Sequence, residues 1–277
     1  MKPIHRGRWR IAAGICYYRL KRYAEWCLSK KDFAHTRRQE LLPHVHFRHQ
    51  TPLLRRLKDV EMWMQHNKVH NLRLATKRLD RVIIRPGETF SYWKLIGKPS
   101  RGKGYLPGMV LSHGRVTAGV GGGLCQLSNL VYWMTLHTPL TVTERHRHSY
   151  DVFPDANRTQ PFGSGATCFY NYLDLQITND TKHEYQLHLH MTDTHLVGEW
   201  RSDMPATRRY TITEKNHVFE PSIWGGYERS NQLYRQVYSL NGEWLQEEWL
   251  ADNRAMVMYE PLLPEKSRGG QTARNQG

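Results

Sequence analysis

Three consecutive glycines, Gly121 to Gly123, separate a segment with strand-like alternation from one with helical periodicity. From Leu124 the apolar residues recur at the spacing of one helix face, and Pro139 ends the pattern soon after His137. Glycine permits positive φ and places no side chain between the backbone and an approaching group. The block therefore predicts a tight turn that leads into a helix, with Cys125 in the first helical turn.

Other parts of the chain divide into helical stretches followed by strands. Helical spacing predicts helices over 9–29, 53–66 and 70–79. Alternation and turn residues predict a strand, turn and strand over 81–97, a hairpin at His113–Gly114, a strand over 139–153, and strands within 166–180 and 185–193. Asn241–Gly242 gives the clearest hairpin signal. We expect an α+β fold with a mostly antiparallel β core, a central helix that carries the cysteine, N-terminal helices and a C-terminal β-hairpin appendage.

The expected organisation follows from these patterns and from the turn-rich stretches between them. It consists of a basic N-terminal helical segment over 1–50, a core domain over 51–205, a C-terminal β appendage over 206–263 and a disordered tail over 264–277. The tail is polar and rich in turn residues, which is typical of chain that cannot bury a core.

The charge balance points to acidic partners. The chain has 40 Lys and Arg against 25 Asp and Glu, a formal net charge of +15. Anionic lipid headgroups, cell-wall polyanions and nucleic acid all fit such a charge. Because the sequence has no zinc-finger spacing, no helix-turn-helix signature and no aromatic RNP strand, no nucleic-acid partner is expected.

The stretch over 9–29 predicts an amphipathic helix. Its apolar face consists of Trp9, Ala13, Cys16, Leu20, Ala24 and Cys27, with basic residues elsewhere around the turn. Such a helix can lie on an anionic membrane surface or dock on the protein's own core. We expect docking on the core, because soluble proteins use amphipathic helices far more often in that way.

The four cysteines, Cys16, Cys27, Cys125 and Cys168, stand at unrelated spacings without a C-x-x-C pair. This predicts neither a disulfide framework nor a zinc ribbon, and it fits a reducing compartment. The sequence has no apolar run of 18 residues and no clean signal-peptide cleavage site. We therefore expect an unprocessed protein in the cytoplasm, and peripheral contact with an anionic membrane surface is the alternative that the sequence leaves open.

Two histidine clusters have a superficial likeness to metal sites. They are His44, His46 and His49, and His188, His190 and His195. No carboxylate or cysteine nearby completes tetrahedral spacing, and in the second cluster the alternation places the histidines toward solvent. No metal and no cofactor is expected.

The cysteine after the glycine block has the features of a nucleophile. A thiol in a first helical turn lies near unpaired backbone N–H groups and the positive end of the helix dipole, which favour the thiolate. The block lacks the Lys and Ser or Thr of a phosphate-binding P-loop and does not match G-x-G-x-x-G. Candidate bases for Cys125 are His146 and His148 on the following strand. Candidates for the carboxylate that orients the base are Asp151, Asp155 and Asp174.

Four separated blocks, over 70–97, 121–140, 144–155 and 165–181, resemble the VanW family in consistent order, and the likeness spans about residues 66–195. The family pattern carries over onto Gly121, Gly122, Gly123, Cys125, Gln126, Glu144, Arg145, His148, Ser149 and Asp174. It selects His148 over His146. Many members have Asp-Ala-Thr where this chain has Gly165, Ala166 and Thr167, so Asp155 or Asp174 would have to supply any acidic role of that position.

The resemblance implies a link to the cell envelope and to glycopeptide-resistance clusters. One hypothesis is a cysteine-dependent acyl transferase or amidase acting on peptidoglycan or a precursor peptide. Its nucleophile would be Cys125, its base His148, the orienting carboxylate Asp174 and an oxyanion donor Gln126. Substrate-binding candidates are Gly121, Gly122, Gly123, Glu144, Arg145, Arg147 and Ser149, the two arginines holding a carboxylate. The alternative is a non-catalytic module that binds an anionic peptide or muropeptide.

Overall fold

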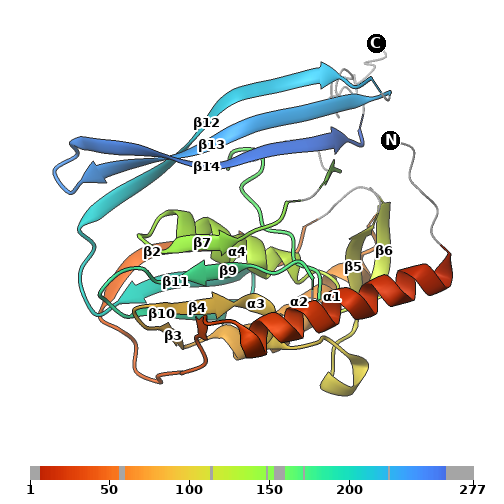
Figure 1. The fold of residues 1–277 in the computed structure, drawn as a ribbon, viewed down its shortest axis with the longest axis horizontal. Coiled ribbons are helices and arrows are strands. Elements are labelled where there is room, and N and C mark those ends of the chain that lie inside the picture. The colour runs from red at the N-terminus through yellow and green to blue at the C-terminus, as the bar shows by residue number, and fades with distance from the viewer. Residues whose placement is uncertain are drawn as a thin grey trace, which may run out of the picture.

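The structure is a computed structural model that describes residues 7–55, 60–112, 115–147, 149–152, 160–170, 172–223 and 225–259. Its helices are α1 (Arg8–Leu28), α2 (Met62–Leu79), α3 (Tyr92–Ile96), the 3-10 turn η1 (Arg101–Lys103) and α4 (Cys125–Leu136). Together with mostly antiparallel sheets they confirm the predicted α+β fold (Figure 1). The predicted tail over 264–277 and the predicted turn at His113–Gly114 lie outside the described residues.

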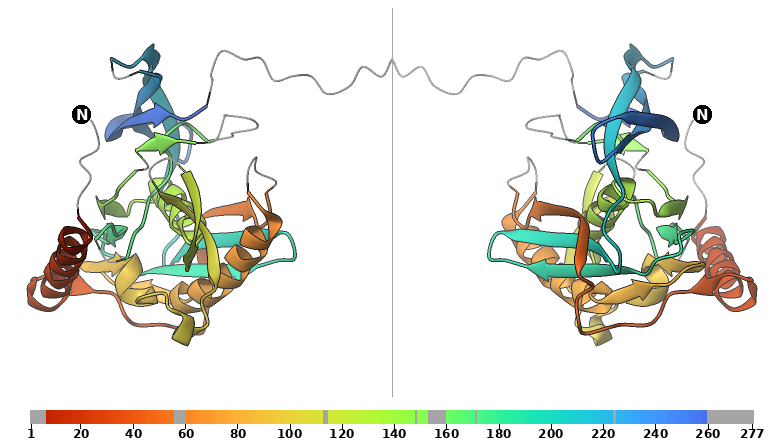
Figure 2. Two further views of the ribbon diagram at one scale, coloured as in Figure 1. Left: turned by 90° about the vertical axis from the view of Figure 1, so that its right-hand side faces the viewer. Right: turned by 90° about the vertical axis from the view of Figure 1, so that its left-hand side faces the viewer.

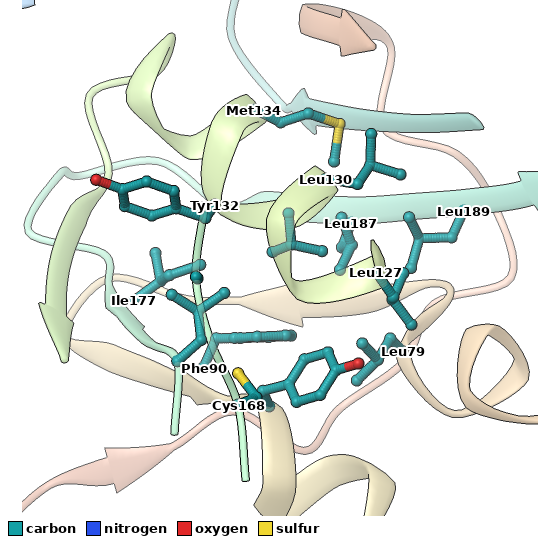
Figure 3. Packing of buried hydrophobic residues seen from close by; sticks show 14 of the residues in the cluster. Leu79, Phe90, Leu127, Leu130, Tyr132, Met134, Cys168, Ile177, Leu187 and Leu189 are labelled. Carbon is teal, nitrogen blue, oxygen red and sulfur yellow. The ribbon is translucent and has the colours of Figure 1, made fainter. Parts of the chain in front are cut away.

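Two four-stranded sheets form the core with α4. The first has the order β1 (Asp32–Phe33), β4 (Glu88–Ser91), β9 (Gln176–Thr178), β7 (Thr141–Glu144). The second has the order β2 (His44–Pro52), β11 (His195–Ser202), β10 (Tyr185–Met191), β3 (Val82–Ile84). The predicted helix after the glycines is confirmed as α4, which contacts β2, β11 and β7. Figure 3 shows its buried side chains, among them Leu127, Leu130 and Met134, within one apolar cluster.

A third four-stranded sheet lies on one side of this core. It consists of β12 (Arg208–Pro221), β13 (Tyr227–Ser239), β14 (Trp244–Val257) and β8 (Tyr150–Asp151), which pairs parallel to β14. The predicted hairpin at Asn241–Gly242 is confirmed, and Gly242 supplies the positive φ of the turn, +89°. The predicted hairpin is extended by a third strand, because β12 pairs along β13 in the C-terminal sheet (Figures 1 and 2).

A separate hairpin packs beside the glycine turn. β5 (Pro107–Ser112) and β6 (Arg115–Val120) pair antiparallel, as predicted, and α2 contacts β5.

The helix predictions near the N-terminus were wrong in part. One helix, α2, replaces the predicted helices over 53–66 and 70–79. Within the predicted N-terminal helical segment over 1–50, the helix ends at Leu28. The residues after it form β1 and β2, which pair with strands of the two core sheets. Sequence reasoning could not see these pairings, since β2 finds its partner β11 more than 140 residues later in the chain.

The predicted strand over 139–153 is broken. β7 ends at Glu144, and the chain crosses to the C-terminal sheet before β8 begins. At the break the Arg145 guanidinium donates to the carbonyl of Gly163, to the carbonyl of Gly165 at 2.9 Å and to Asn253 Oδ1 at 2.9 Å. These hydrogen bonds turn the Arg145 side chain toward the interior of the protein. The inward and outward alternation of side chains expected of a strand therefore ends here. Within the predicted strand over 166–180, the regular part is β9 alone.

The expectation for the N-terminal helix was wrong about which face contacts the core. The confirmed helix α1 docks through Arg22, which is buried, and Trp26, which packs against the core. The apolar face is exposed at every position, namely Trp9, Ala13, Cys16, Leu20, Ala24 and Cys27. Among the described residues, no helix is long and apolar enough to cross a bilayer.

Candidate functional site

The glycine turn before α4 is packed against the protein's own atoms. Gly121 and Gly123 have positive φ angles of +77° and +91°. A Cβ added at Gly122 would lie 2.2 Å from the backbone carbonyl of Gly108 on β5, and one at Gly123 would lie 2.1 Å from Cγ of Lys68 on α2. The space that glycine leaves free is therefore occupied by β5 and α2. Close packing explains these glycines without an approaching substrate.

Polar residues of α2 hold this turn, and sequence reasoning missed them. Asn71 Nδ2 donates to the carbonyls of Gly122 at 3.0 Å and Leu106 at 2.9 Å. Lys68 is buried, and its burial together with the nearby Arg55 lowers the pKa of its amine to about 8. The sequence does contain a sign of this role. Lys68 and Asn71 stand at helical spacing on the same face of α2 as the buried Leu72.

Cys125 is the first residue of α4, and the residue as a whole is half-buried. Its Sγ lies 3.7 Å from the carbonyl oxygen of Cys168, to which it donates. Burial raises the pKa of the Cys125 thiol. This direction runs against the expected thiolate, because the effect of burial exceeds the opposite effect of the backbone hydrogen bonds at Cys168 and Cys125.

Gln126 ties α4 to the end of β2. Its Nε2 donates to Thr51 Oγ1 at 2.9 Å and to the carbonyl of Pro52 at 2.8 Å. An amide nitrogen carries two hydrogens, so both donors are used within the protein. In this conformation Gln126 has no donor left for an oxyanion.

Asp174 lies in the core and accepts hydrogen bonds from its surroundings. Its Oδ2 accepts from Ser91 Oγ at 2.5 Å, and its Oδ1 accepts from the backbone N–H groups of Trp93 and Leu175 at 2.9 Å each. Burial raises the pKa of the Asp174 carboxyl to about 6. The other two carboxylate candidates differ in place. Asp151 is buried in β8, and Asp155 lies outside the described residues.

Glu144 is the centre of an ion-pair network at the end of β7. Its carboxylate accepts two hydrogen bonds from Arg22, one from His146 Nε2 at 3.0 Å and one from the backbone N–H of Asp174 at 3.0 Å. Burial alone would raise the pKa of Glu144, but the hydrogen bonds from His146 and Arg22 hold it at about 2. His146 is thus bound to Glu144. His148 lies outside the described residues, so its pairing with Cys125 or Asp174 stays a prediction.

A cleft of about 880 Å³ lies between the core and the C-terminal sheet. Its core wall comes from the end of α4, from β7 and from the irregular segment after it, and its other wall comes from β13 and β14. The lining residues are Tyr132, Leu136, Leu140, Thr141, Val142, Thr143, Arg145, His146, Arg147, Ser149, Leu173, Arg235, Glu248, Trp249, Leu250, Ala251 and Asp252. Three predicted substrate-binding residues, Arg145, Arg147 and Ser149, are thereby brought together, whereas Cys125, Gln126 and Asp174 are not part of the lining.

The three arginines that line the cleft, Arg145, Arg147 and Arg235, differ in their hydrogen-bond partners. Arg145 has the three protein acceptors described above. Arg235 pairs with Glu248 at 2.5 Å and donates to the carbonyl of Thr138 at 2.7 Å. Arg147 differs, because its Nη1 is buried and has no hydrogen-bond partner within the part of the chain that the structure describes. Burial and the neighbouring charge of Arg145 lower the pKa of Arg147.

At least one histidine of each cluster has a partner within the protein. His188 Nδ1 lies 3.0 Å from Asp80 Oδ1, and His46 Nε2 lies 2.9 Å from the carbonyl oxygen of Met204. Across the described ranges, no three His, Cys, Asp or Glu side chains converge as metal ligands would.

Two comparisons with known proteins point to the same family. The sequence pattern of the family described as VanW like protein matches residues 67–201, from α2 to β11. Over 251 residues the chain is 33% identical to vancomycin B-type resistance protein VanW of Enterococcus faecalis (strain ATCC 700802 / V583), which covers 91% of this chain and 89% of that protein. Over 86 residues it is 33% identical to the uncharacterized protein YoaR of Bacillus subtilis (strain 168), 31% of this chain and 28% of that protein. No solved structure matches.

Proposed function

The chain belongs to the VanW family, and from this premise we propose that it binds an anionic peptide or muropeptide in the cleft between the core and the C-terminal sheet. The name of the Enterococcus faecalis relative connects that protein with vancomycin resistance. We carry over to this chain a role at the cell envelope, with peptidoglycan or a precursor peptide as the source of the ligand.

The observation that carries this proposal is that the buried Nη1 of Arg147 has no hydrogen-bond partner among the described residues. A buried guanidinium nitrogen without an acceptor costs free energy, because it has lost water and gained nothing in exchange. A carboxylate is the natural acceptor, since it matches the planar fork of the guanidinium group. Burial and the charge of Arg145 lower the pKa of Arg147, and this second positive charge nearby adds to the attraction for an anion.

The other walls of the cleft suit a short peptide. Trp249 and Leu250 on β14 offer apolar surface, and the exposed Ser149 offers a hydroxyl. Ligand sites in proteins commonly have volumes of about 300 to 1,000 Å³, a range that includes this cleft. A peptide of a few residues with a terminal carboxylate therefore fits both the size and the charge.

Calorimetric titration with a synthetic peptide of peptidoglycan-stem composition tests the proposal. The peptide is used in two forms, with a free C-terminal carboxylate and with a C-terminal amide. A charge-assisted hydrogen bond contributes about 1.5 to 3 kcal/mol, so we expect the carboxylate form to bind roughly 10 to 100 times more tightly. Arg147→Gln should remove this preference.

The matched control is Arg209→Gln. Arg209 is exposed on β12, so the substitution changes the net charge equally without touching the cleft. It should keep the preference for the carboxylate. Equal binding of both peptide forms by the wild-type protein, or equal loss in both variants, would refute the cleft as the site.

The catalytic alternative is a cysteine-dependent acyl transferase or amidase that acts on peptidoglycan or a precursor peptide. In its favour, Cys125 begins α4 and the residue as a whole is half-buried. Against it, burial raises the pKa of the thiol, and Cys125 does not line the cleft. Thiol labelling across pH, resolved by peptide mass spectrometry with Cys125→Ser as the blank, separates the two. A labelling midpoint well below the ordinary thiol pKa of about 8.5 would favour catalysis.

A further inference from the structure

The outward face of α1 is an apolar stripe without a partner among the described residues. Trp9 is 90% exposed and Leu20 63% exposed, and Cys16 and Cys27 are exposed at the same helical spacing. Tyr17, beside the stripe, is 61% exposed. Trp9 and Leu20 are the two large side chains of the stripe, and the rest are alanines and cysteines. A continuous apolar face that is exposed on a helix marks a contact surface.

The rotation of α1 is fixed by its other face. Arg22 makes a bidentate pair with Glu144, Trp26 packs against the core, and the ring of Tyr18 lies 5.5 Å from the ring of Tyr172. To turn the stripe inward, the helix would have to break the buried Arg22 pair. The stripe therefore stays outward in the folded protein.

The charges beside the stripe are positive. Arg10 and Lys21 are exposed near its edge, and no ion pair of either is found among the described residues. Glu25 is the one acidic residue of α1, and it is already paired with Arg22 and Lys31. The outward side of the helix thus combines tryptophan, tyrosine and leucine with unpaired cations.

We propose that α1 binds a membrane surface that contains anionic lipid. Tryptophan and tyrosine favour the boundary between headgroups and acyl chains, and Arg10 and Lys21 are placed to reach lipid phosphates. A second copy of the chain is the weaker occupant, because a symmetric pairing through this face would bring the same cations together. α1 lies on the outside of the molecule, away from the C-terminal sheet that forms one wall of the cleft (Figures 1 and 2).

Co-sedimentation with vesicles tests the proposal. We use vesicles of phosphatidylcholine alone and vesicles with an equal share of phosphatidylglycerol. The wild-type protein should bind the anionic vesicles at least ten times more strongly, and the binding should weaken as salt is added. The double variant Trp9→Glu with Leu20→Glu should lose at least tenfold in binding.

The matched control replaces two exposed apolar residues elsewhere. Ile223 and Trp244 of the C-terminal half are 89% and 59% exposed, so Ile223→Glu with Trp244→Glu makes the same chemical change. This variant should bind as the wild type does. Similar binding by both double variants, or no binding by the wild type, would overturn the proposal.

The native thiols give a second readout. An environment-sensitive fluorophore on Cys16, in a variant in which the other three cysteines are serine, should shift to the blue when anionic vesicles are added. A variant that lacks Cys16 and keeps Cys168, which is buried, supplies the background. Sedimentation velocity tests whether a second copy of the chain binds this face instead. A wild-type dimer that the Trp9→Glu, Leu20→Glu variant abolishes, without any vesicle binding, would assign the face to a second copy.

Discussion

Arg22 and Glu144 stand 122 residues apart in the chain, yet their side chains make two hydrogen bonds, Nη2 to Oε1 at 2.5 Å and Nη1 to Oε2 at 2.6 Å. The same carboxylate accepts from His146 and from the backbone of Asp174. The N-terminal helix is therefore joined to the end of β7, beside the segment that leads into the cleft. Glu144 is fully used inside the protein, which makes it a structural residue and not a substrate ligand in this conformation.

Breaking this pair should destabilise the protein. Arg22→Gln leaves a largely buried carboxylate without its main partner, so we expect the free energy of unfolding to fall by about 3 to 5 kcal/mol. Urea denaturation followed by tryptophan fluorescence measures this. Arg254→Gln is the control, because Arg254 pairs with Glu228 on an exposed strand and should change stability little. Comparable losses in the two variants would mean that the Arg22 pair has no special role.

The close packing of the glycine turn predicts a sharp difference between two glycines. In Gly122→Ala the new Cβ would meet the Gly108 backbone, so the turn or β5 must shift, at a cost of about 1 to 3 kcal/mol or more. Gly102 has no atom within 4 Å of such a Cβ, and Gly102→Ala should leave stability nearly unchanged. Thermal unfolding by circular dichroism decides between them. If both alanine variants melt with the wild type, the turn is loosely packed and the glycines need another explanation.

Asp174 should give the protein a pH-dependent stability. Burial raises its pKa to about 6 in the folded protein, against about 3.9 when unfolded, so folding favours the protonated form. This contribution is fully present below pH about 4 and is lost as pH rises through about 6. Asp174→Asn removes the titration and keeps an acceptor for the Trp93 N–H. Relative to wild type, the variant should therefore gain stability between pH 4.5 and 7, measured by urea unfolding at several pH values.

The network partner of Asp174 provides an internal check on that prediction. Glu144 has its pKa held at about 2, so its contribution is present above its unfolded pKa of about 4.3 and is lost as pH falls toward 2. The two carboxylates therefore act in separate pH windows. A stability difference between Asp174→Asn and wild type that stays constant from pH 4.5 to 7 would show that Asp174 does not titrate in this range.

The elements that local signals specify were predicted correctly. Apolar residues that recur about every 3.6 positions after the glycines predicted α4. The pair Asn241–Gly242 predicted the turn between β13 and β14. In both cases the residues that determine the structure are neighbours in sequence. Arg147 and Ser149 were also proposed as binding residues, and the structure places both in the cleft.

The features that depend on distant partners were not predicted. The alternating residues after Glu144 resemble a strand. The Arg145 side chain instead donates hydrogen bonds to the carbonyls of Gly163 and Gly165 and to Asn253, and no local sequence pattern indicates these partners. The buried face of α1 is set by Glu144, so counting apolar residues selected the wrong face. The other wall of the cleft likewise comes from residues of β13 and β14 that stand more than 80 positions after Arg147 in the chain.

The central claim is that the cleft, and not the loop before Cys125, receives the ligand. The most direct measurement is photocrosslinking with a stem peptide that carries a diazirine beside its C-terminal carboxylate, followed by peptide mass spectrometry. We predict saturable labelling of residues 141–152 or 248–252, with competition by the unmodified carboxylate peptide and loss in Arg147→Gln. Labelling confined to residues 121–126, or labelling that neither saturates nor depends on Arg147, would contradict this account.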